Sequence, residues 1–255
     1  MQTMVDYRRA LEVVTTRSMP EEVISVRSEN NISLGYEIDD TITSLKNAGK
    51  LVTFTVSDVL EFLYANQGFV LVNMDAVQGR LTYTGYTVIK DGQYAGFISI
   101  NDACGLVWLL GSNITRNYTV QTDAYLATVE VKCRSRDIQP QYVNGQVVFN
   151  IRMVFNSRVL YLDRDVRFDA RQAQTVKNRL QKILADDIAQ AINQSRSFDC
   201  DYLEFYDHFR IAYPNIASQL DWESAYQNAV FNISTTVSVD PGGMLDMQAQ
   251  GKEAS

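Results

Sequence analysis

The stretch ATVEVKCRSRDIQPQYVNGQVVFNIRMVFN, residues 127–156, decides the fold. In its first part, apolar residues at 127, 129, 131 and 133 alternate with polar residues at 128, 130, 132 and 134, the period of a strand with one solvated face. In its last part, Phe149, Ile151, Met153 and Phe155 repeat that period. The Asn144-Gly145 pair between them favours a tight turn. The stretch therefore predicts a long antiparallel hairpin.

Toward the C-terminus, the period changes to that of a helix beyond Asp163. A break at 195–197 precedes an aromatic helix, Tyr202 to Ile211, which Pro214 ends. Alternation from Ala229 to Ser238 predicts a last strand, and we expect the tail after Gly243 to be disordered. The apolar stripe of the long helix covers about five turns and consists of Ala173, Val176, Leu180, Ile183, Leu184, Ile188 and Ala191.

Toward the N-terminus, the runs 81–89 and 94–100 flank Asp91-Gly92 and predict a second hairpin. Asn101 then begins a short apolar helix over 102–110 that Gly111 closes, and we expect this helix to be buried.

The region from Met19 to Val72 predicts small α/β pieces. These are a helix that begins at Pro20, a helix over 38–47, an amphipathic stretch capped by Thr55 or Ser57, and a strand over 69–73. Polar and glycine residues at 75–79 separate two apolar runs, and we place a domain boundary there. The predicted division is 1–75, 76–243 and a tail over 244–255. The predicted fold is α+β, with an antiparallel sheet covered by the long helix in the C-terminal domain and a small α/β domain before it.

Composition and charge exclude several classes of function. The net charge is −7 and Lys/Arg residues do not cluster, so a nucleic-acid partner is not expected. The same acidity disfavours direct binding to anionic lipid. No apolar run approaches the roughly 20 residues of a membrane-spanning helix. Residues 1–10 show no apolar core of an export signal.

Candidate catalytic groups are few. His208 is the one histidine, and Cys104, Cys133 and Cys200 are widely spaced without a CxxC pair. We expect the cysteines to fill the core and His208 to be half-buried or on a helix surface. A Cys133–His208 dyad is the alternative, although no local nucleophile motif supports it. We expect no disulfide framework and no zinc site.

Acidic and aromatic residues leave two interpretations open. Asp186 and Asp187, with Asp199 and Asp201 downstream, suggest carboxylates for acid/base work or calcium, yet their spacing fits no calcium loop and favours structural roles. On a helix, Asp186 falls on the solvated face and Asp187 turns toward the apolar stripe. No phosphate-binding glycine motif occurs. Six tyrosines suit either a protein-binding surface or half-buried strands: Tyr83, Tyr86, Tyr94, Tyr202, Tyr206 and Tyr213.

An ordered series of short motifs resembles the Ger(x)C family of spore germination lipoproteins. The series covers about Arg80 to Gly243, with a weaker similarity over 10–72. Its motifs are 85–92, Ala95-Gly96-Phe97, the run 105–111, the strand 131–136, the helix 176–191, Asp201, Phe205, Tyr213-Pro214 and Asp221-Trp222. The sequence departs from the family by lacking the lipobox cysteine and signal peptide and by a shortened N-terminal region. His208 precedes Phe209-Arg210, near where the family has the run "ihrkyp", and this resemblance favours a structural place for His208 over catalysis.

The resemblance implies a C subunit of a spore nutrient germinant receptor. It implies a position at the outer face of the spore inner membrane and partners among the integral membrane receptor subunits. Membrane association would then depend on a family lipid anchor that this chain lacks. We expect no enzyme activity, no catalytic, cofactor-binding or metal-binding residues, and no cofactor. The alternatives are an extracytoplasmic protein that binds a small solute and, less favoured, a thiol-dependent hydrolase.

Overall fold

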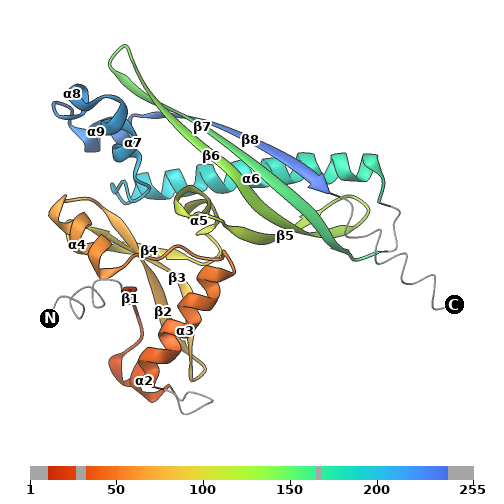
Figure 1. The fold of residues 1–255 in the computed structure, drawn as a ribbon, viewed down its shortest axis with the longest axis horizontal. Coiled ribbons are helices and arrows are strands. Elements are labelled where there is room, and N and C mark those ends of the chain that lie inside the picture. Colours follow the sequence, from red (N-terminus) through yellow and green to blue (C-terminus); the bar gives the residue numbers. More distant parts are fainter. Residues whose placement is uncertain (1–10, 27–32, 165–167, 241–255) are drawn as a thin grey trace.

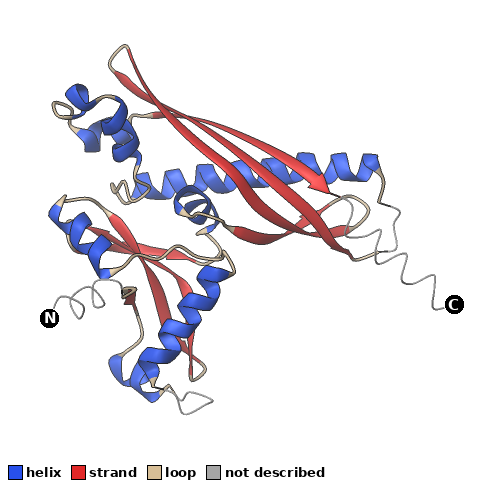
Figure 2. Ribbon diagram, in the orientation of Figure 1, coloured by secondary structure: helices blue, strands red, loops and turns tan. Residues whose placement is uncertain are grey.

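Two four-stranded sheets organise the chain in the computed structural model, which describes residues 11–26, 33–164 and 168–240 (Figure 1). The first sheet has the order β1-β2-β3-β4 and the second the order β5-β6-β7-β8. Helix α6, Ala170–Ser197, lies along the second sheet, and the short helices α7 to α9 gather at one end of it (Figure 2). The α+β prediction is confirmed.

The first sheet is built from β1 (Val14–Thr15), β2 (Phe69–Val77), β3 (Arg80–Lys90) and β4 (Gln93–Ser99). Helices α2 (Pro20–Ser25), α3 (Leu34–Asn47) and α4 (Val56–Tyr64) accompany it. Thr55 is the N-cap of α4, in a reciprocal capping box with Asp58. The β3–β4 turn has positive φ at both Asp91 and Gly92, as the sequence predicts.

The predicted domain boundary at 75–79 falls inside this sheet. Val77 pairs with Arg80, and Gln78 and Gly79 form the two-residue turn with positive φ angles. Polar and glycine residues here mark a hairpin rather than a linker, because tight turns need the same residue types. The division into two domains remains a prediction; the two sheets would place it between β4 and β5.

The second sheet contains β5 (Thr115–Gln121), β6 (Leu126–Val143), β7 (Gln146–Leu162) and β8 (Val230–Asp240). The long β6–β7 hairpin is confirmed, with its turn at Asn144-Gly145. The alternating inward residues are buried against the apolar stripe of α6. Asp169 is the N-cap of this helix. The buried residues of this contact include Val129, Val131, Phe149, Ile151, Met153, Phe155, Val176, Leu180, Leu184, Ile188 and Ala191.

The last strand differs from the prediction of antiparallel pairing. β8 pairs with β7 in parallel, from Val148↔Val230 to Arg158↔Asp240. Between these strands the chain runs the length of α6 and through α7 (Phe205–Ala212), α8 (Pro214–Ala217) and α9 (Trp222–Gln227). A crossover of this length returns the chain to the starting end of the sheet, so the next strand can run parallel.

Helix α5, Cys104–Leu110, joins the two sheets at the centre of the molecule. It begins two residues later than predicted, because Ser99 and Asp102 form a turn in which Ser99 Oγ donates to Asp102 Oδ2 over 2.6 Å. Arg136 Nη1 donates to the carbonyl oxygens of Trp108 and Gly111 and so satisfies the C-terminal end of the helix. The predicted burial of this helix is confirmed.

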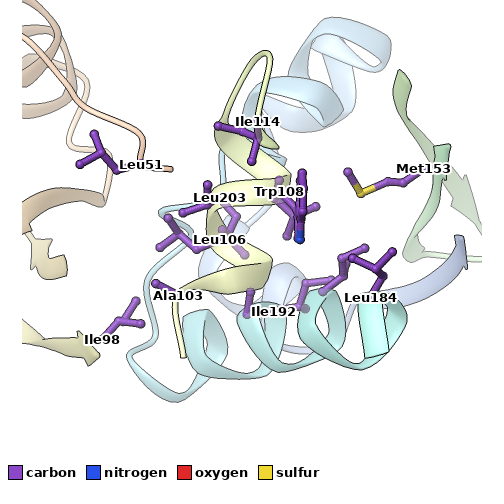
Figure 3. Close-up of a cluster of buried hydrophobic side chains, with 14 of the residues drawn as sticks. Leu51, Ile98, Ala103, Leu106, Trp108, Ile114, Met153, Leu184, Ile192 and Leu203 are labelled. Carbon is purple, nitrogen blue, oxygen red and sulfur yellow. The ribbon is translucent and has the colours of Figure 1, made fainter. Parts of the chain in front are cut away.

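The side chains of α5 lie between hydrophobic groups from both sheets. Figure 3 shows Leu106 and Trp108 with Ile98 on one side and Met153 and Leu184 on the other. The Trp108 ring meets Phe155 edge-on at 5.1 Å between centroids. One continuous core therefore spans both sheets.

The remaining predictions concern the start of α7, the two ends of the chain and membrane-spanning helices. Helix α7 begins at Phe205 rather than Tyr202, whose side chain is buried in the preceding turn. The predicted tail over 244–255 and the N-terminal residues 1–10 lie outside the described residues. Within the described ranges, no helix combines the length and apolarity needed to cross a bilayer.

Candidate functional site

A pocket of about 320 Å³ lies where the first sheet meets the helical segment that follows α6. We call it the junction pocket. One side comes from α4, the α4–β2 loop and the β3–β4 turn, and the other from residues 199–227. The lining residues are Phe62, Ala65, Asn66, Gln67, Gly68, Lys90, Asp91, Asp199, Cys200, Asp201, Glu204, Tyr206, Trp222, Glu223, Tyr226 and Gln227.

Direct contacts hold the two sides together. Lys90 Nζ lies 2.5 Å from Glu223 Oε1, and Gln67 Nε2 donates to Asp207 Oδ2 over 3.1 Å. The Cys200 thiol points at the Ile89 carbonyl oxygen at 3.6 Å. Beside it, Gly68 lies so close to Cys200 Sγ that a Cβ would overlap the sulfur. This glycine lets the α4–β2 loop approach the helical segment.

Asp201 lines the pocket and organises its helical side. Its carboxylate accepts the backbone N–H groups of Phe205 at 3.1 Å and Tyr206 at 2.7 Å, and the Trp222 indole Nε1–H at 3.1 Å. Burial raises the pKa of Asp201 to about 6, although these three hydrogen bonds favour its charged form. The carboxylate thus positions α7 and α9 relative to each other.

The pocket carries excess negative charge. Five carboxyl groups line it, those of Asp91, Asp199, Asp201, Glu204 and Glu223, against one ammonium group, that of Lys90. The hydrogen bond to Glu223 raises the pKa of Lys90, so this ammonium group is committed to an ion pair.

Aromatic side chains form the rest of the lining. The rings of Tyr206 and Trp222 lie 5.2 Å apart, and those of Trp222 and Tyr226 lie 5.9 Å apart. Carboxylates beside aromatic faces suit a positively charged group.

The structure does not support the Cys133–His208 dyad. Burial raises the pKa of the Cys133 thiol, which donates toward Ser135 O at 3.6 Å. Burial, followed by the charge of Arg136, lowers the pKa of His208. Within the part of the chain that the structure describes, no hydrogen bond joins the two side chains. A thiol with a raised pKa is a poor nucleophile near neutral pH.

The four aspartates of the acid/base or calcium interpretation lie in two places. Asp186 is exposed and pairs with Lys182 at 2.6 Å, while Asp187 accepts from the Tyr118 hydroxyl at 2.7 Å. Asp199 and Asp201 line the junction pocket instead. Among residues 11–26, 33–164 and 168–240, no three potential ligands gather as a metal site would require.

The remaining candidates divide between core and surface. Cys200 is buried, with a pKa raised to about 12 by burial, and Cys104 and Cys133 are half-buried free thiols. Of the six tyrosines considered for a binding surface, Tyr83, Tyr86 and Tyr202 are buried, Tyr94 is exposed, and Tyr206 and Tyr213 are half-buried. Tyr206 alone of these lines the junction pocket.

Most pocket residues escape sequence reasoning. In the sequence, Phe62 is one more apolar position of an amphipathic helix. Glu204 and Glu223 have the pattern of ordinary acidic residues on a surface. They meet because the first sheet docks on a segment more than a hundred residues later. The one local signal is Asp201 followed by Trp222, both of which belong to the motifs of the family resemblance.

The comparisons with known proteins agree on one family. A family profile described as "Spore germination B3/GerAC like, C-terminal" matches residues 84–243, from β3 through β8. The spore germination protein YndF of Bacillus subtilis (strain 168) is 22% identical over 213 residues, which cover 78% of this chain and 51% of that protein. The chain therefore spans about half the length of this curated relative.

A solved structure shares the fold. The crystal structure titled as that of the GerBC protein superposes with a TM-score of 0.70 and 17% sequence identity. The match covers 91% of this chain and 69% of that chain, so it includes both sheets.

Proposed function

The chain belongs to the spore germination B3/GerAC-like family, and from this membership we propose that it serves as the C subunit of a spore nutrient germinant receptor. In this role it acts by binding neighbouring proteins and performs no catalysis. The observation that carries the proposal is the family match over residues 84–243, which spans α5, the whole second sheet and one side of the junction pocket.

The chemistry of the described residues supports a binding role. The candidate nucleophiles are thiols with raised pKa values, and the histidine has a lowered one. Asp201, whose pKa burial raises to about 6, accepts three hydrogen bonds that fix the fold around it. The raised thiol pKa values leave little thiolate near neutral pH, and the Asp201 carboxylate is engaged in hydrogen bonds of the fold, so the support is for a binding role.

We further propose that the partners are the integral membrane subunits of the receptor and that the protein works at the outer face of the spore inner membrane. The family membership and the name of YndF, a spore germination protein, support this location. The acidic net charge is consistent with contact to proteins rather than to anionic lipid headgroups.

Deletion of the gene in its spore-forming host tests the proposal. The mutant spores should lose the response to one nutrient germinant and keep their response to a germinant read by another receptor. A plasmid copy should restore the lost response, and a copy carrying Asp186→Asn, an exposed change on α6, should restore it equally. Deletion spores that respond normally to every nutrient tested would contradict the proposal.

The junction pocket favours a second candidate, an extracytoplasmic protein that binds a small solute. Its volume lies at the lower end of the range for ligand sites. A thermal-shift screen of the purified protein with amino acids and sugars tests this candidate, since a ligand that binds the folded state raises the melting temperature.

A further inference from the structure

The outward face of α4 is unusually apolar. Leu60, Leu63 and Tyr64 are 55%, 41% and 94% exposed. The helix is well anchored from its other side, because Phe62 contacts Phe54 at 5.1 Å and Phe69 at 5.3 Å between ring centroids. Exposed apolar groups on a fixed helix mark contact surfaces more often than scattered single residues do. We call these three residues the α4 stripe.

The α4 stripe continues into the junction pocket. Phe62 and Ala65 line the pocket from the same helix end. A Cβ at Gly92 would lie 3.4 Å from Leu63 Cδ2, so the stripe borders the β3–β4 turn. That turn supplies Lys90 and Asp91 to the pocket, and Tyr94, 65% exposed, follows it. Apolar surface and acidic pocket therefore form one continuous area.

At the pocket end of this area, the carboxyl groups of the lining residues outnumber the one lining ammonium group. Lys90 is paired with Glu223, and Asp199 accepts from the Gln227 amide at 2.7 Å. Glu204, at the rim, sits in the left-handed backbone region with φ of 63°. Burial raises the pKa of Glu204 and the repulsion of Asp207 adds to this, while the charge of Arg136 acts in the opposite direction. A further cation in the pocket would favour the charged form of Glu204.

We propose that the junction pocket receives an arginine side chain of a partner protein and that the α4 stripe packs against the apolar neighbours of that arginine. This inference deepens the proposed protein-binding function and rests on it. The planar guanidinium group can pair with carboxylates through two N–H groups and stack on the Tyr206 and Trp222 rings. A buried cationic or aromatic anchor beside apolar contacts is the usual anatomy of an interface hot spot.

A protein partner fits better than a free amine. A small amine would fill the pocket and leave the α4 stripe exposed to water. A peptide segment covers the pocket and the α4 stripe together, so its affinity depends on contacts at both places. The two sources of the same cationic group are therefore separable by experiment.

The test uses the whole purified chain and the blocked tripeptide acetyl-leucyl-arginyl-leucine amide. The chain has two tryptophans, so their indole N–H signals in a ¹H–¹⁵N spectrum report binding site by site. Trp222 lines the pocket, and Trp108, 1% exposed, is an internal reference. We expect a saturable shift of the Trp222 signal alone. The same tripeptide with citrulline, which has the shape of arginine without the charge, should bind about tenfold more weakly, the loss expected for one charge-assisted hydrogen bond.

Matched variants locate the contacts. Glu204→Gln and Asp91→Asn should each weaken binding about three- to fivefold, as expected for a partly exposed ion pair, whereas Asp186→Asn on α6 should not. Tyr64→Ala should weaken binding of the tripeptide, and Tyr161→Ala, at another exposed tyrosine on β7, should not.

Three results would overturn the inference. The first is equal binding of the arginine and citrulline peptides. The second is free arginine amide that binds as tightly as the tripeptide, with no effect of Tyr64→Ala, which would assign the pocket to a solute. The third is an unmoved Trp222 signal at millimolar peptide. The germination phenotype of the deletion strain is a separate measurement, so any of these three results would contradict the arginine site without contradicting the proposed function.

Discussion

Replacing Gly105 with alanine should separate α5 from α6. Gly105 is buried on α5 and faces the backbone of α6. A methyl group there would lie 2.9 Å from Ala191 Cβ and closer still to the carbonyl oxygen of Asp187. Ordinary contact begins at 3.4 Å, so Ala191 would have to retreat by about 0.5 Å (3.4 minus 2.9) and the rigid carbonyl by more.

The cost follows from these two obstructions. Overpacking of a filled core destabilises by about 1–3 kcal/mol, and we take the upper end because a backbone carbonyl cannot rotate away. The better helix propensity of alanine returns about 1 kcal/mol. We therefore expect Gly105→Ala to lower the free energy of unfolding by about 2 kcal/mol, which corresponds to roughly 4–8 °C in Tm for a chain of this size.

Urea denaturation followed by circular dichroism measures this change. Gly35→Ala is the matched control, because Gly35 lies on α3 and a methyl group added there would have no neighbour within 4 Å, so this change should leave stability equal or raise it by about 0.5 kcal/mol. If Gly105→Ala unfolded at the same urea concentration as the parent chain, the close crossing of α5 and α6 would be refuted.

Three further predictions concern charged groups. The pKa of Asp201 is about 6 in the folded chain against the ordinary value of 3.8, so the folded state binds a proton more tightly than the unfolded state does. The stability that this proton contributes is present below about pH 4 and is lost as the pH rises through 6. Urea titrations at pH 4 and pH 7 should show Asp201→Asn gaining stability relative to the parent at the higher pH, and a constant difference would count against the raised pKa. The side chains of the Lys90–Glu223 pair are 30% and 60% exposed, so a double-mutant cycle with Lys90→Met and Glu223→Gln should give a coupling below about 1 kcal/mol. Arg136→Met should cost about 2 kcal/mol, because two carbonyl oxygens at the end of α5 lose a charged donor; a Tm within 1 °C of the parent would show that water replaces it.

Much of the fold follows from local periodicity. The alternation around Val129 and Ile151 and the turn pair Asn144-Gly145 predict the β6–β7 hairpin, since the alternation gives each strand one apolar face. The register also contains two irregularities, at Thr128/Val129 and Cys133/Ser135, which the pattern does not predict. The apolar stripe of α6 is equally clear because it recurs over about five turns of this 28-residue helix. These elements are strongly specified by their own sequence.

The errors arise where local sequence is silent about long-range pairing. Gln78-Gly79 suits a hairpin turn and a linker alike, and only the pairing of Val77 with Arg80 distinguishes them. The alternation in β8 reveals a strand but not its direction. The N-terminal end of α7 depends on Asp201, four residues before Phe205, which no ordinary capping pattern would indicate.

The candidate site was harder to foresee for the same reason. The sequence suggests Asp199 and Asp201 as candidates for acid/base work or calcium, and Tyr206 as a candidate for a protein-binding surface. It does not indicate that the three line one pocket. Their association with Phe62 and Lys90 results from docking of the first sheet, whose key permissive residue, Gly68, carries no chemical signal of its own.

The parallel pairing of β8 with β7 has a consequence during synthesis. As the ribosome releases the chain, the β6–β7 hairpin emerges early, and one margin of β7 stays bare until the residues up to Asp240 have followed. Closing so large a loop is slow relative to local folding. Until then the unpaired edge of β7 can pair with a strand of another chain. Pairing of the eleven-residue strand β8 with β7 therefore protects this edge from aggregation.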